Sequence, residues 1–388
     1  MKTDWQAAVL GLGGIGSGAL YWLARRLGGD VLGVEQFALG HDRGGSHDHS
    51  RIIRLSYHTP AYVALAAAAY DAWSEVESEA GERLVHSCGG LDLFPFGGAI
   101  PMADYTASLA ARAVPFEVLA AAEIRARWPQ FRRLDGVTGL FQERGGLVAA
   151  ARATAAHQRL AREHGAALVE RAAVAGVSQV GDEVEITVDG VRHRAGRLVV
   201  AAGAWSNRVL AGLGLRLPLA VTQEQVTYFA ARDLDRFAMD RFPIWIWMDE
   251  PCFYGFPVFG EQGVKVAQDV GGPVVSAETR SFEPDRGALA RARGFLARHL
   301  PAALGPELFT KTCLYTLTPD RDFVVDRLPE APGVWLAIGA GHAFKFASVL
   351  GRCLSELALD GATAADLEAF RIGRPVLWQD DPPTSYLI

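Results

Sequence analysis

The N-terminal part of the chain places two short apolar runs on either side of a glycine-rich segment and a longer apolar stretch. The run over 7–10 leads directly into glycine-rich residues 11–16, and a stretch rich in Ala and Leu follows over 17–24. The second run, 31–34, ends at the carboxylate Glu35. This order predicts a strand, a tight turn, a helix and a second strand, as in a nucleotide-binding βαβ unit.

Alternation of predicted strands and helices resumes in two later parts of the chain, over 149–205 and 334–359. Residues 183–188 alternate as a solvated strand does, and Asp189-Gly190 then predicts a hairpin turn. The apolar run over 197–205 ends in small residues, which suits a buried parallel strand whose end meets a ligand. The other predicted elements are a helix over 149–164, strands over 167–170, 174–177 and 334–339, a turn at Gly341-His342 and a helix over 347–359.

Two intervening segments have a different pattern of apolar and polar residues. Residues 88–139 contain short strands such as 90–94 and a helix that ends at Trp128-Pro129, because proline stops helical propagation. Residues 217–315 are rich in aromatic and β-branched residues and predict an antiparallel sheet. We therefore predict an α/β (α+β) fold of two interleaved domains. The ranges 1–87, 145–216 and 320–388 form a Rossmann-like dinucleotide-binding domain, and 88–144 with 217–319 form an antiparallel-sheet substrate domain.

The spacing of the glycines explains how a dinucleotide would be held. Gly11 allows the tight turn, Gly13 lets the backbone approach a pyrophosphate, and Gly16 lets the helix pack closely on the strand. The N-terminus of the helix then faces the anion, and Glu35, about 20 residues on, can accept hydrogen bonds from a ribose. The simpler alternative is a glycine-rich turn in an ordinary βαβ unit.

Composition narrows the function classes. The 388 residues are half hydrophobic and can bury a large core, and the net charge of −6 argues against a nucleic-acid partner. No stretch reaches the roughly 18 apolar residues of a membrane span, and the start does not look like a signal peptide, so we expect a cytoplasmic protein. The four cysteines, 88, 252, 313 and 353, lack metal-ligand spacing, so we expect neither a disulfide framework nor a metal site.

Lysine is rare in this chain. Only four of the 38 basic residues are lysines, and Lys265, Lys311 and Lys345 stand among apolar neighbours. An ammonium shifts its pKa when it is desolvated, which a guanidinium does not do readily. Retained lysines are therefore candidates for functional sites.

Several motifs together carry a resemblance to a known family. They are Gly45-Ser46-His47, Ser50-Arg51-Ile52-Ile53-Arg54, Gly203-Ala204-Trp205, Tyr254-Gly255-Phe256-Pro257, the strand of Lys265, Cys313-Leu314-Tyr315-Thr316 and Gly341-His342-Ala343-Phe344-Lys345-Phe346. With these motifs the chain resembles the monomeric sarcosine oxidase and N-methyltryptophan oxidase family of flavoenzymes, from the glycine loop to Arg374-Pro375.

The resemblance implies an FAD cofactor bound covalently. Cys313 matches the cysteine that forms a thioether to the flavin 8α-methyl group, although a buried free cysteine is the simpler alternative. Arg51 matches an arginine against the flavin ring, and the helix after Gly341 would stabilise a reduced flavin. The loop around His47, Asp48 and His49 is one residue shorter than the family pattern. The cofactor-binding residues implied are Gly11, Gly13, Gly14, Ile15, Gly16, Glu35, Ser46, His47, Arg51, Val174, Gly203, Trp205, Cys313, Gly341, His342, Phe344 and Lys345.

The resemblance also implies roles in catalysis. Lys265 matches the lysine that activates oxygen above the flavin, whereas a strand lysine reaching solvent is the simpler alternative. Arg54 and Lys345 match the pair that binds the substrate carboxylate, although each could form an ordinary salt bridge. Tyr254 and Tyr315 match two tyrosines that flank the substrate.

Two positions depart from the family pattern. Trp245 stands where the sarcosine enzymes carry a methionine over the substrate, and it would narrow the site. Asp269 stands where they carry a histidine, and it could pair with Lys265 or with a cationic group on the substrate. Sarcosine itself therefore becomes a doubtful substrate, while the chemistry of amine oxidation should survive.

The implied function is FAD-dependent oxidation of a secondary, N-methyl α-amino acid by O₂, giving an imine and hydrogen peroxide, in a monomer with no macromolecular partner. A flavin oxidase of a glycated or a cyclic, pipecolate-like amino acid fits the same residues. A flavin dehydrogenase with another electron acceptor and a non-catalytic flavoprotein are further alternatives. An NAD-dependent dehydrogenase would explain residues 11–35 but leaves Lys265 and Cys313 without a role.

Overall fold

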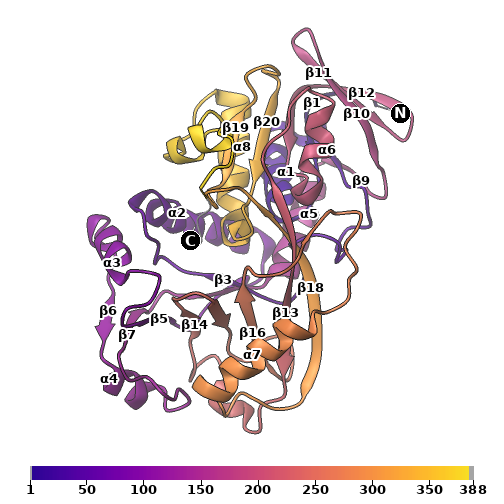
Figure 1. Cartoon of the computed structure of the whole chain (residues 1–388). Helices are drawn as coiled ribbons and strands as arrows, with labels where there is room; N and C mark the ends of the chain where they lie inside the picture. Colours follow the sequence, from indigo (N-terminus) through magenta and orange to yellow (C-terminus); the bar gives the residue numbers. More distant parts are fainter. Residues whose placement is uncertain (1, 384–388) are drawn as a thin grey trace.

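Two large sheets, linked by several crossings of the chain, dominate the computed structural model, which describes residues 2–383 (Figure 1). Residues 1 and 384–388, which the first predicted domain includes, lie outside the described part. In the first sheet, β9, β2, β1, β12 and β20 are neighbouring parallel strands in that order. The strands of this sheet are β1 (Asp4–Leu10), β2 (Val31–Val34), β9 (Ala167–Val169), β10 (Val174–Val180), β11 (Glu183–Val188), β12 (Val191–Val200), β19 (Val324–Arg327) and β20 (Val334–Ile338).

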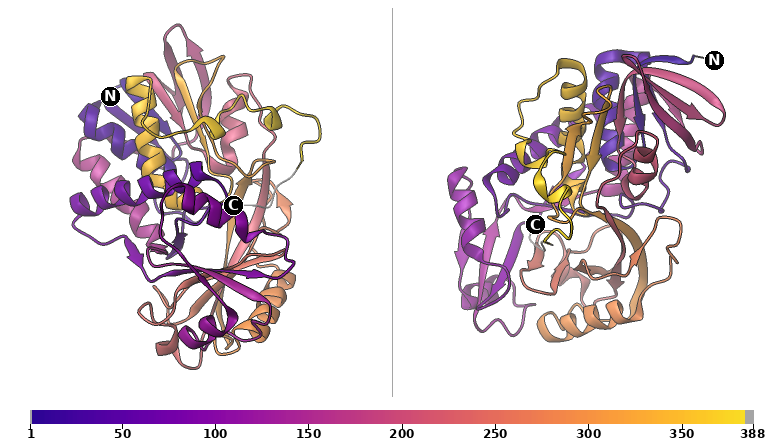
Figure 2. Two further views of the ribbon diagram at one scale, coloured as in Figure 1. Left: turned by 90° about the vertical axis from the view of Figure 1, so that its left-hand side faces the viewer. Right: turned by 45° about the horizontal axis from the view of Figure 1, so that its top comes forward.

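Helices cover one face of the first sheet. Alternate residues of β1 enter different cores, with Val9 packing among the helices and Leu10 packing with the strands β10–β12. Helix α1 contacts both α5 and α8, and the three lie together in Figure 2. A Cβ atom at Gly18 would lie 2.5 Å from the carbonyl oxygen of Ala347, so α1 and α8 approach backbone to backbone. The helices of this face are α1 (Gly14–Leu27), α2 (Pro60–Ala80), α5 (Ala150–Glu163) and α8 (Ala347–Asp360), whereas α6 (Ser206–Ala211) contributes Leu210 to the core that contains Leu10.

The predicted hairpin in this sheet is confirmed. Strands β11 and β12 pair antiparallel across Asp189 and Gly190, whose φ angles are 48° and 79°. Positive φ at both central residues is the geometry that matches the twist of two-residue hairpins, and Asp-Gly adopts it readily. The mixed α/β fold is confirmed as well.

The second sheet runs in the order β17-β13-β16-β15-β14-β5-β7-β6, with β18 along β13. The prediction of an antiparallel sheet is correct except at one seam, because β14 and β5 come from different segments of the chain and run parallel. Its strands are β5 (Gly90–Pro95), β6 (Glu117–Leu119), β7 (Val137–Gln142), β13 (Ala220–Phe229), β14 (Ile244–Trp247), β15 (Cys252–Gly255), β16 (Val264–Asp269), β17 (Val274–Val275) and β18 (Glu307–Leu317). Helices α3 (Met102–Ala111), α4 (Ala121–Arg127) and α7 (Arg286–His299) belong to the same segments.

Both sheets meet at the place where the chain crosses between them. A small antiparallel sheet of β3 (Arg51–Ile53), β8 (Gly146–Val148) and β4 (Val85–Ser87) lies there, and β18 reaches up to η2 (Gly203–Trp205) of the first sheet (Figure 1). The strands of each sheet come from the same segments as one predicted domain, and the division into domains itself stays a prediction. The remaining short helices are η1 (Gly28–Asp30), η3 (Leu234–Phe237), η4 (Ala343–Phe346), η5 (Glu368–Phe370) and η6 (Pro375–Leu377).

Residues 2–383 lack two features, a membrane-spanning helix and a cluster of metal ligands. None of their helices is long and apolar enough to cross a membrane. They also hold no group of three or more His, Cys, Asp or Glu side chains placed to bind a metal ion.

A matched pair of glycine substitutions tests the packing of α1 on β1. A Cβ atom at Gly16 would collide with the carbonyl oxygen of Gly11, whereas a Cβ at Gly294, exposed on α7, meets no atom within 4 Å. We expect Gly16→Ala to lower the free energy of unfolding and Gly294→Ala to raise it by about 0.5–1 kcal/mol, because alanine loses less backbone entropy in a helix. Urea unfolding measures both, and a neutral Gly16→Ala would contradict the close approach.

Candidate active site

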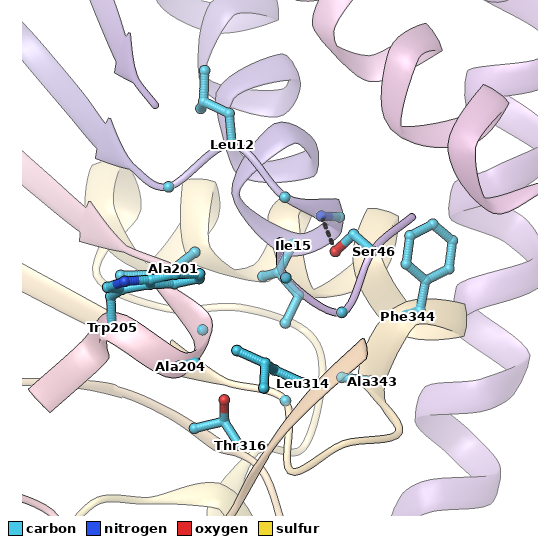
Figure 3. Close-up of a pocket in the computed structure, with 18 of the residues that line it drawn as sticks. Leu12, Ile15, Ser46, Ala201, Ala204, Trp205, Leu314, Thr316, Ala343 and Phe344 are labelled. Atoms are coloured by element: carbon cyan, nitrogen blue, oxygen red, sulfur yellow. Dashed lines mark hydrogen bonds between the residues drawn. The ribbon is translucent and has the colours of Figure 1, made fainter. Parts of the chain in front are cut away.

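A cavity of about 410 Å³ lies between the carboxyl ends of the parallel strands and the second sheet. The glycine turn forms one end of it. Gly11 has φ of +85°, and a Cβ atom there would lie 2.6 Å from the carbonyl oxygen of Ala201. Gly13 lines the cavity, and the atom nearest to a Cβ built there is the Ser46 hydroxyl oxygen. Gly14 N–H donates to Ser46 Oγ at 2.8 Å (Figure 3). The turn therefore offers bare backbone and a helix N-terminus, the setting that pyrophosphates occupy.

Glu35 closes the glycine end of the cavity as a buried carboxylate. It accepts hydrogen bonds from Leu12 N–H at 2.8 Å and Phe37 N–H at 3.0 Å, and His41 Nε2 lies 3.4 Å away. Burial works to raise the pKa of Glu35, but the hydrogen bonds from His41 and the two amides outweigh it and lower the pKa. The ionised carboxylate keeps further lone pairs for ribose hydroxyls.

Most of the predicted cofactor residues line this cavity. Figure 3 shows Ile15, Ser46, Trp205, Leu314 and Phe344 around the end of α1. The predicted residues on the wall are Gly11, Gly13, Gly14, Ile15, Glu35, Ser46, His47, Arg51, Val174, Gly203, Trp205, Gly341, His342, Phe344 and Lys345. Gly16 is absent from the wall because it faces Gly11, and Cys313 adjoins the wall residue Leu314 without lining the cavity itself. Burial raises the pKa of the Cys313 thiol to about 11.

The loop before β3 places two predicted cofactor residues. Arg51 donates from Nη1 to the Ser50 carbonyl at 2.9 Å and from Nη2 to the Gly45 carbonyl at 2.8 Å. Its guanidinium carbon lies 6.0 Å from the ring centroid of Phe344. Burial, followed by the charge of Arg51, lowers the pKa of His47 to about 4, so this wall residue is neutral at pH 7.

Asp48, whose role the sequence left open, is a buried anchor in the same loop. It adopts φ of +83°, and its carboxylate lies 2.7 Å from Lys265 Nζ, 3.5 Å from Lys311 Nζ and 3.9 Å from Arg51 Nη1. The Tyr228 hydroxyl also donates to it at 3.0 Å. Burial works to raise the pKa of Asp48, but the charges of Lys265 and Arg51 hold it below its usual range. One carboxylate thus joins the cofactor loop to strands β13, β16 and β18.

Lys265 lies one layer behind the cavity wall. It is 2 % exposed, donates to the Ser50 carbonyl at 2.8 Å, and places Nζ 4.5 Å from the ring centroid of Phe256, which lines the cavity. Burial lowers the pKa of Lys265 to about 8, and Asp48 offsets part of this shift. The simpler alternative, a strand lysine that reaches solvent, is therefore wrong, and the proposed role of Lys265 in oxygen activation stays a prediction.

Lys345 and Arg54 both line the cavity, and their environments differ. Arg54 is 1 % exposed and places Nη1 3.2 Å from both oxygens of Asp92, which also accepts from the Ser56 hydroxyl. Lys345 lines the cavity, and within residues 2–383 its Nζ has neither a hydrogen bond nor a carboxylate partner. Burial, followed by the charge of Arg54, lowers the pKa of Lys345 to about 7. A carboxylate ligand would complete this site.

Tyr254 and Tyr315 line the cavity and meet across it, with their hydroxyls 3.5 Å apart. The prediction that Trp245 lies over a substrate is wrong. Successive residues of a strand point to opposite faces, so Ile246, the partner of Tyr254 in register, lines the cavity and Trp245 faces the other side. There Trp245 is fully buried and stacks on Phe295 at 5.3 Å.

The suggested pairing of Asp269 with Lys265 is also wrong. The two residues lie four apart on β16, which separates them by about 13 Å along an extended strand. Asp269 lines the cavity and lies 2.8 Å from Nη1 of Arg321, whose backbone carbonyl contacts His342 Nε2 at 2.8 Å. Sequence reasoning missed Arg321, Asp92 and Ile246. A signal was available for Asp92, a lone carboxylate in an apolar strand.

Comparison with known proteins identifies the cofactor that this cavity fits. A profile of FAD dependent oxidoreductases matches residues 6–357. The chain belongs to this family. It is 34% identical to monomeric sarcosine oxidase of Streptomyces avermitilis, over 95% of this chain and 97% of the relative, and 30% identical to monomeric sarcosine oxidase of Arthrobacter sp., over 98% and 99%. It is 28% identical to N-methyl-L-tryptophan oxidase of Yersinia pestis, over 96% and 99%. The family predicted from the motifs is confirmed.

Solved structures agree with this assignment. The amino acid oxidase NikD, described as essential for nikkomycin biosynthesis, superposes with a TM-score of 0.84 at 26% identity over 100% of this chain and 99% of that chain. L-proline dehydrogenase from P. horikoshii superposes with a TM-score of 0.81 at 22% identity over 96% and 97%, which shows a shared fold. This protein is an FAD-dependent oxidoreductase, which favours FAD over the nicotinamide alternative. The bare glycine turn, the Glu35 carboxylate and the wall from Val174 to Trp205 fit that cofactor.

The Asp48 anchor predicts a pH-dependent loss of stability. The folded-state pKa of Asp48 is depressed, so its contribution is present above the unfolded pKa near 4 and is lost as the pH falls below it. Asp48→Asn should lower the free energy of unfolding by about 3–5 kcal/mol at pH 7, because it leaves Lys265 buried without its carboxylate. The difference from the unaltered protein should shrink below pH 4 in denaturant titrations.

A control for this measurement is Asp135→Asn, because the Asp135 side chain is 95% exposed. We expect that substitution to change the free energy of unfolding by less than about 0.5 kcal/mol. An Asp48→Asn deficit of equal size at pH 3 and pH 7 would contradict the ion-pair account.

Proposed function

We propose that this protein oxidises secondary, N-methyl α-amino acids with FAD and O₂, giving an imine, which water hydrolyses to an aldehyde and an amine, and hydrogen peroxide. The observation that carries the proposal is Lys345, a cavity cation without a carboxylate partner in the described chain, beside Arg54 and the tyrosine pair. Curated relatives named for oxidation of sarcosine and N-methyl-L-tryptophan support it.

The substrate's carboxylate binds at Lys345 and Arg54 in this proposal. Protonated Lys345 supplies a positive charge that has no carboxylate partner in the described chain, while Arg54 is held in place by Asp92. Tyr254 and Tyr315 lie beside the ligand, and Ile246 and Phe256 form the apolar wall around its side chain. FAD, when bound, supplies the redox chemistry by taking hydrogen and two electrons from the carbon attached to nitrogen. The protein contributes chiefly orientation, so a neutral amine needs no dedicated base.

Lys265 is proposed to assist the reduction of oxygen. Its ammonium stabilises the anion that forms when oxygen accepts an electron. Asp48 and the Ser50 carbonyl fix the ammonium in the layer behind Phe256, close to the Arg51 loop. A fixed, desolvated charge interacts more strongly with a developing anion than a solvated one does.

The covalent link to FAD is likewise proposed, through a thioether from Cys313. The residue lies on β18 directly before the wall residues Leu314 and Tyr315. Burial raises the pKa of its thiol, and the charge of Arg51 offsets part of this shift. Forming the bond replaces one S–H and one C–H bond by a C–S bond and releases two protons and two electrons, which O₂ takes up as hydrogen peroxide.

The cytoplasmic location and the monomeric state stay predictions.

Anaerobic mixing tests the proposed reaction. FAD-loaded protein is mixed with sarcosine, larger N-methyl amino acids, pipecolate and a fructosyl amino acid, and loss of the oxidised flavin absorbance is followed. We expect an N-methyl amino acid to give the fastest loss of colour. Reduction by the glycated or the cyclic substrate alone would move the assignment to those classes, and no reduction by any amine would contradict an oxidase.

Lys265→Met separates the two half-reactions. We expect flavin reoxidation by O₂ to slow by about 100-fold or more, with flavin reduction nearly unchanged, because the ammonium acts on the oxygen anion. Lys311→Met is the matched control, since Lys311 also lies near Asp48 but its side chain is 38% exposed. In the unaltered enzyme, reoxidation should slow as the pH rises above about 8, where Lys265 loses its proton. Equal effects on both half-reactions would contradict this role.

Cys313→Ser tests the thioether. After acid denaturation and centrifugation, we expect flavin colour and the mass of FAD to stay with the unaltered polypeptide on the Cys313 peptide. The serine variant should release its FAD. Cys353→Ser is the control, because Cys353 is buried in the helical core away from the cavity. Release of FAD from the unaltered protein would contradict covalent attachment but leave a flavoenzyme.

A further inference from the structure

Five charged side chains gather around the end of the cavity that holds Lys345. Two arginines there are already paired, Arg54 with Asp92 at 3.2 Å and Arg321 with Asp269 at 2.8 Å. All four of these side chains are within electrostatic range of Lys345. When Lys345 is protonated, the group therefore carries one net positive charge, and that charge is on Lys345.

The pairs are fixed by the fold. Asp92 lies on β5, where Ser56 also donates to it, and Asp269 lies at the end of β16. Each of these side chains is less than a tenth exposed. A buried charge destabilises the protein unless an opposite charge compensates it. Removal of one member of a buried pair is destabilising as well. A ligand cannot easily displace Asp92 or Asp269 from its arginine.

The histidine and two tyrosines near Lys345 do not change this count. Burial, followed by the charges of Arg321 and Lys345, lowers the pKa of His342 well below its usual range, so the histidine is neutral. Tyr57, whose ring lies 5.7 Å from Lys345 Nζ, and Tyr315 both have raised pKa values because they are buried. They stay uncharged near pH 7.

We propose that Asp92 and Asp269 set the substrate class by charge: each neutralises one arginine, and the site accepts a ligand with a single carboxylate and an uncharged side chain. Asp269 lines the cavity and meets the ligand directly, whereas Asp92 is a positioning residue that acts through Arg54. A second carboxylate finds no uncompensated cation. A basic side chain finds no uncompensated carboxylate.

This proposal deepens the proposed function, and it rests on that function only for the placement of the ligand carboxylate. The selectivity proposed depends on the net charge of the ligand and not on its size. Removing either carboxylate should free an arginine and raise the net charge by one. The site should then tolerate a dianion.

Malonate and its monoamide, malonamate, are probes of nearly equal shape that differ in one charge. Their binding to the FAD-loaded enzyme at pH 7 is followed by the perturbation of flavin absorbance and by competition with sarcosine. We expect the unaltered enzyme to prefer malonamate. Asp92→Asn and Asp269→Asn should each shift the ratio of the two dissociation constants toward malonate by about tenfold.

Control variants separate charge from structure. Asp92→Glu and Asp269→Glu keep the charge and should keep the preference of the unaltered enzyme, and Asp135→Asn should not change it. If one asparagine variant fails to fold, the other variant and the unaltered enzyme still decide the matter. A preference for malonate in the unaltered enzyme, or an unchanged ratio in the asparagine variants that fold, would overturn the proposal.

The two proposals fail separately. If no N-methyl amino acid is oxidised but malonamate is preferred and the asparagine variants shift the ratio, the proposed function is wrong and the charge count holds. If oxidation occurs and the ratio does not move, the charge count is wrong and the proposed function holds.

Discussion

The need to compensate buried charge governs this structure. Asp48, Asp92 and Asp269 each hold a basic side chain that arrives from another part of the chain, at distances between 2.7 and 3.2 Å. An unpaired charge in a dry interior costs several kcal/mol, so such pairs fix where each cation can be. Lys345 departs from this rule within the described chain, and the departure marks the place where a ligand supplies the missing negative charge.

The same constraint joins the two halves of the molecule. The first sheet provides bare backbone at Gly11 and Gly13 and the carboxylate of Glu35, which suit a dinucleotide. The second sheet provides Tyr254, Ile246 and Asp269 on its inner face. Asp48 fastens the loop of the first half to Lys265 of the second half. A cofactor and a small carboxylate can therefore be held against each other in one cavity.

Local patterns in the sequence predicted the parts of the site that depend on local structure. The glycine turn, the Asp189-Gly190 hairpin and the strand ending at Glu35 follow from neighbouring residues. Features that depend on the facing of a strand or on distant partners were not predictable in the same way. The prediction for Trp245 is out of phase by one residue. A shift of one residue along a strand moves the side chain to the opposite face of the sheet. The pairs of Asp92 and Asp269 involve arginines 38 and 52 residues away, so only the tertiary fold reveals them.

A crystal structure of the FAD-loaded protein with a bound simple monocarboxylate would show whether a ligand supplies the negative charge that Lys345 lacks in the described chain. We expect a carboxylate oxygen within hydrogen-bond distance of Lys345 Nζ, next to Arg54 and between Tyr254 and Tyr315, with the pairs Arg54–Asp92 and Arg321–Asp269 unbroken. A carboxylate bound away from Lys345, or one that displaces Asp92 or Asp269 from its arginine, would contradict it.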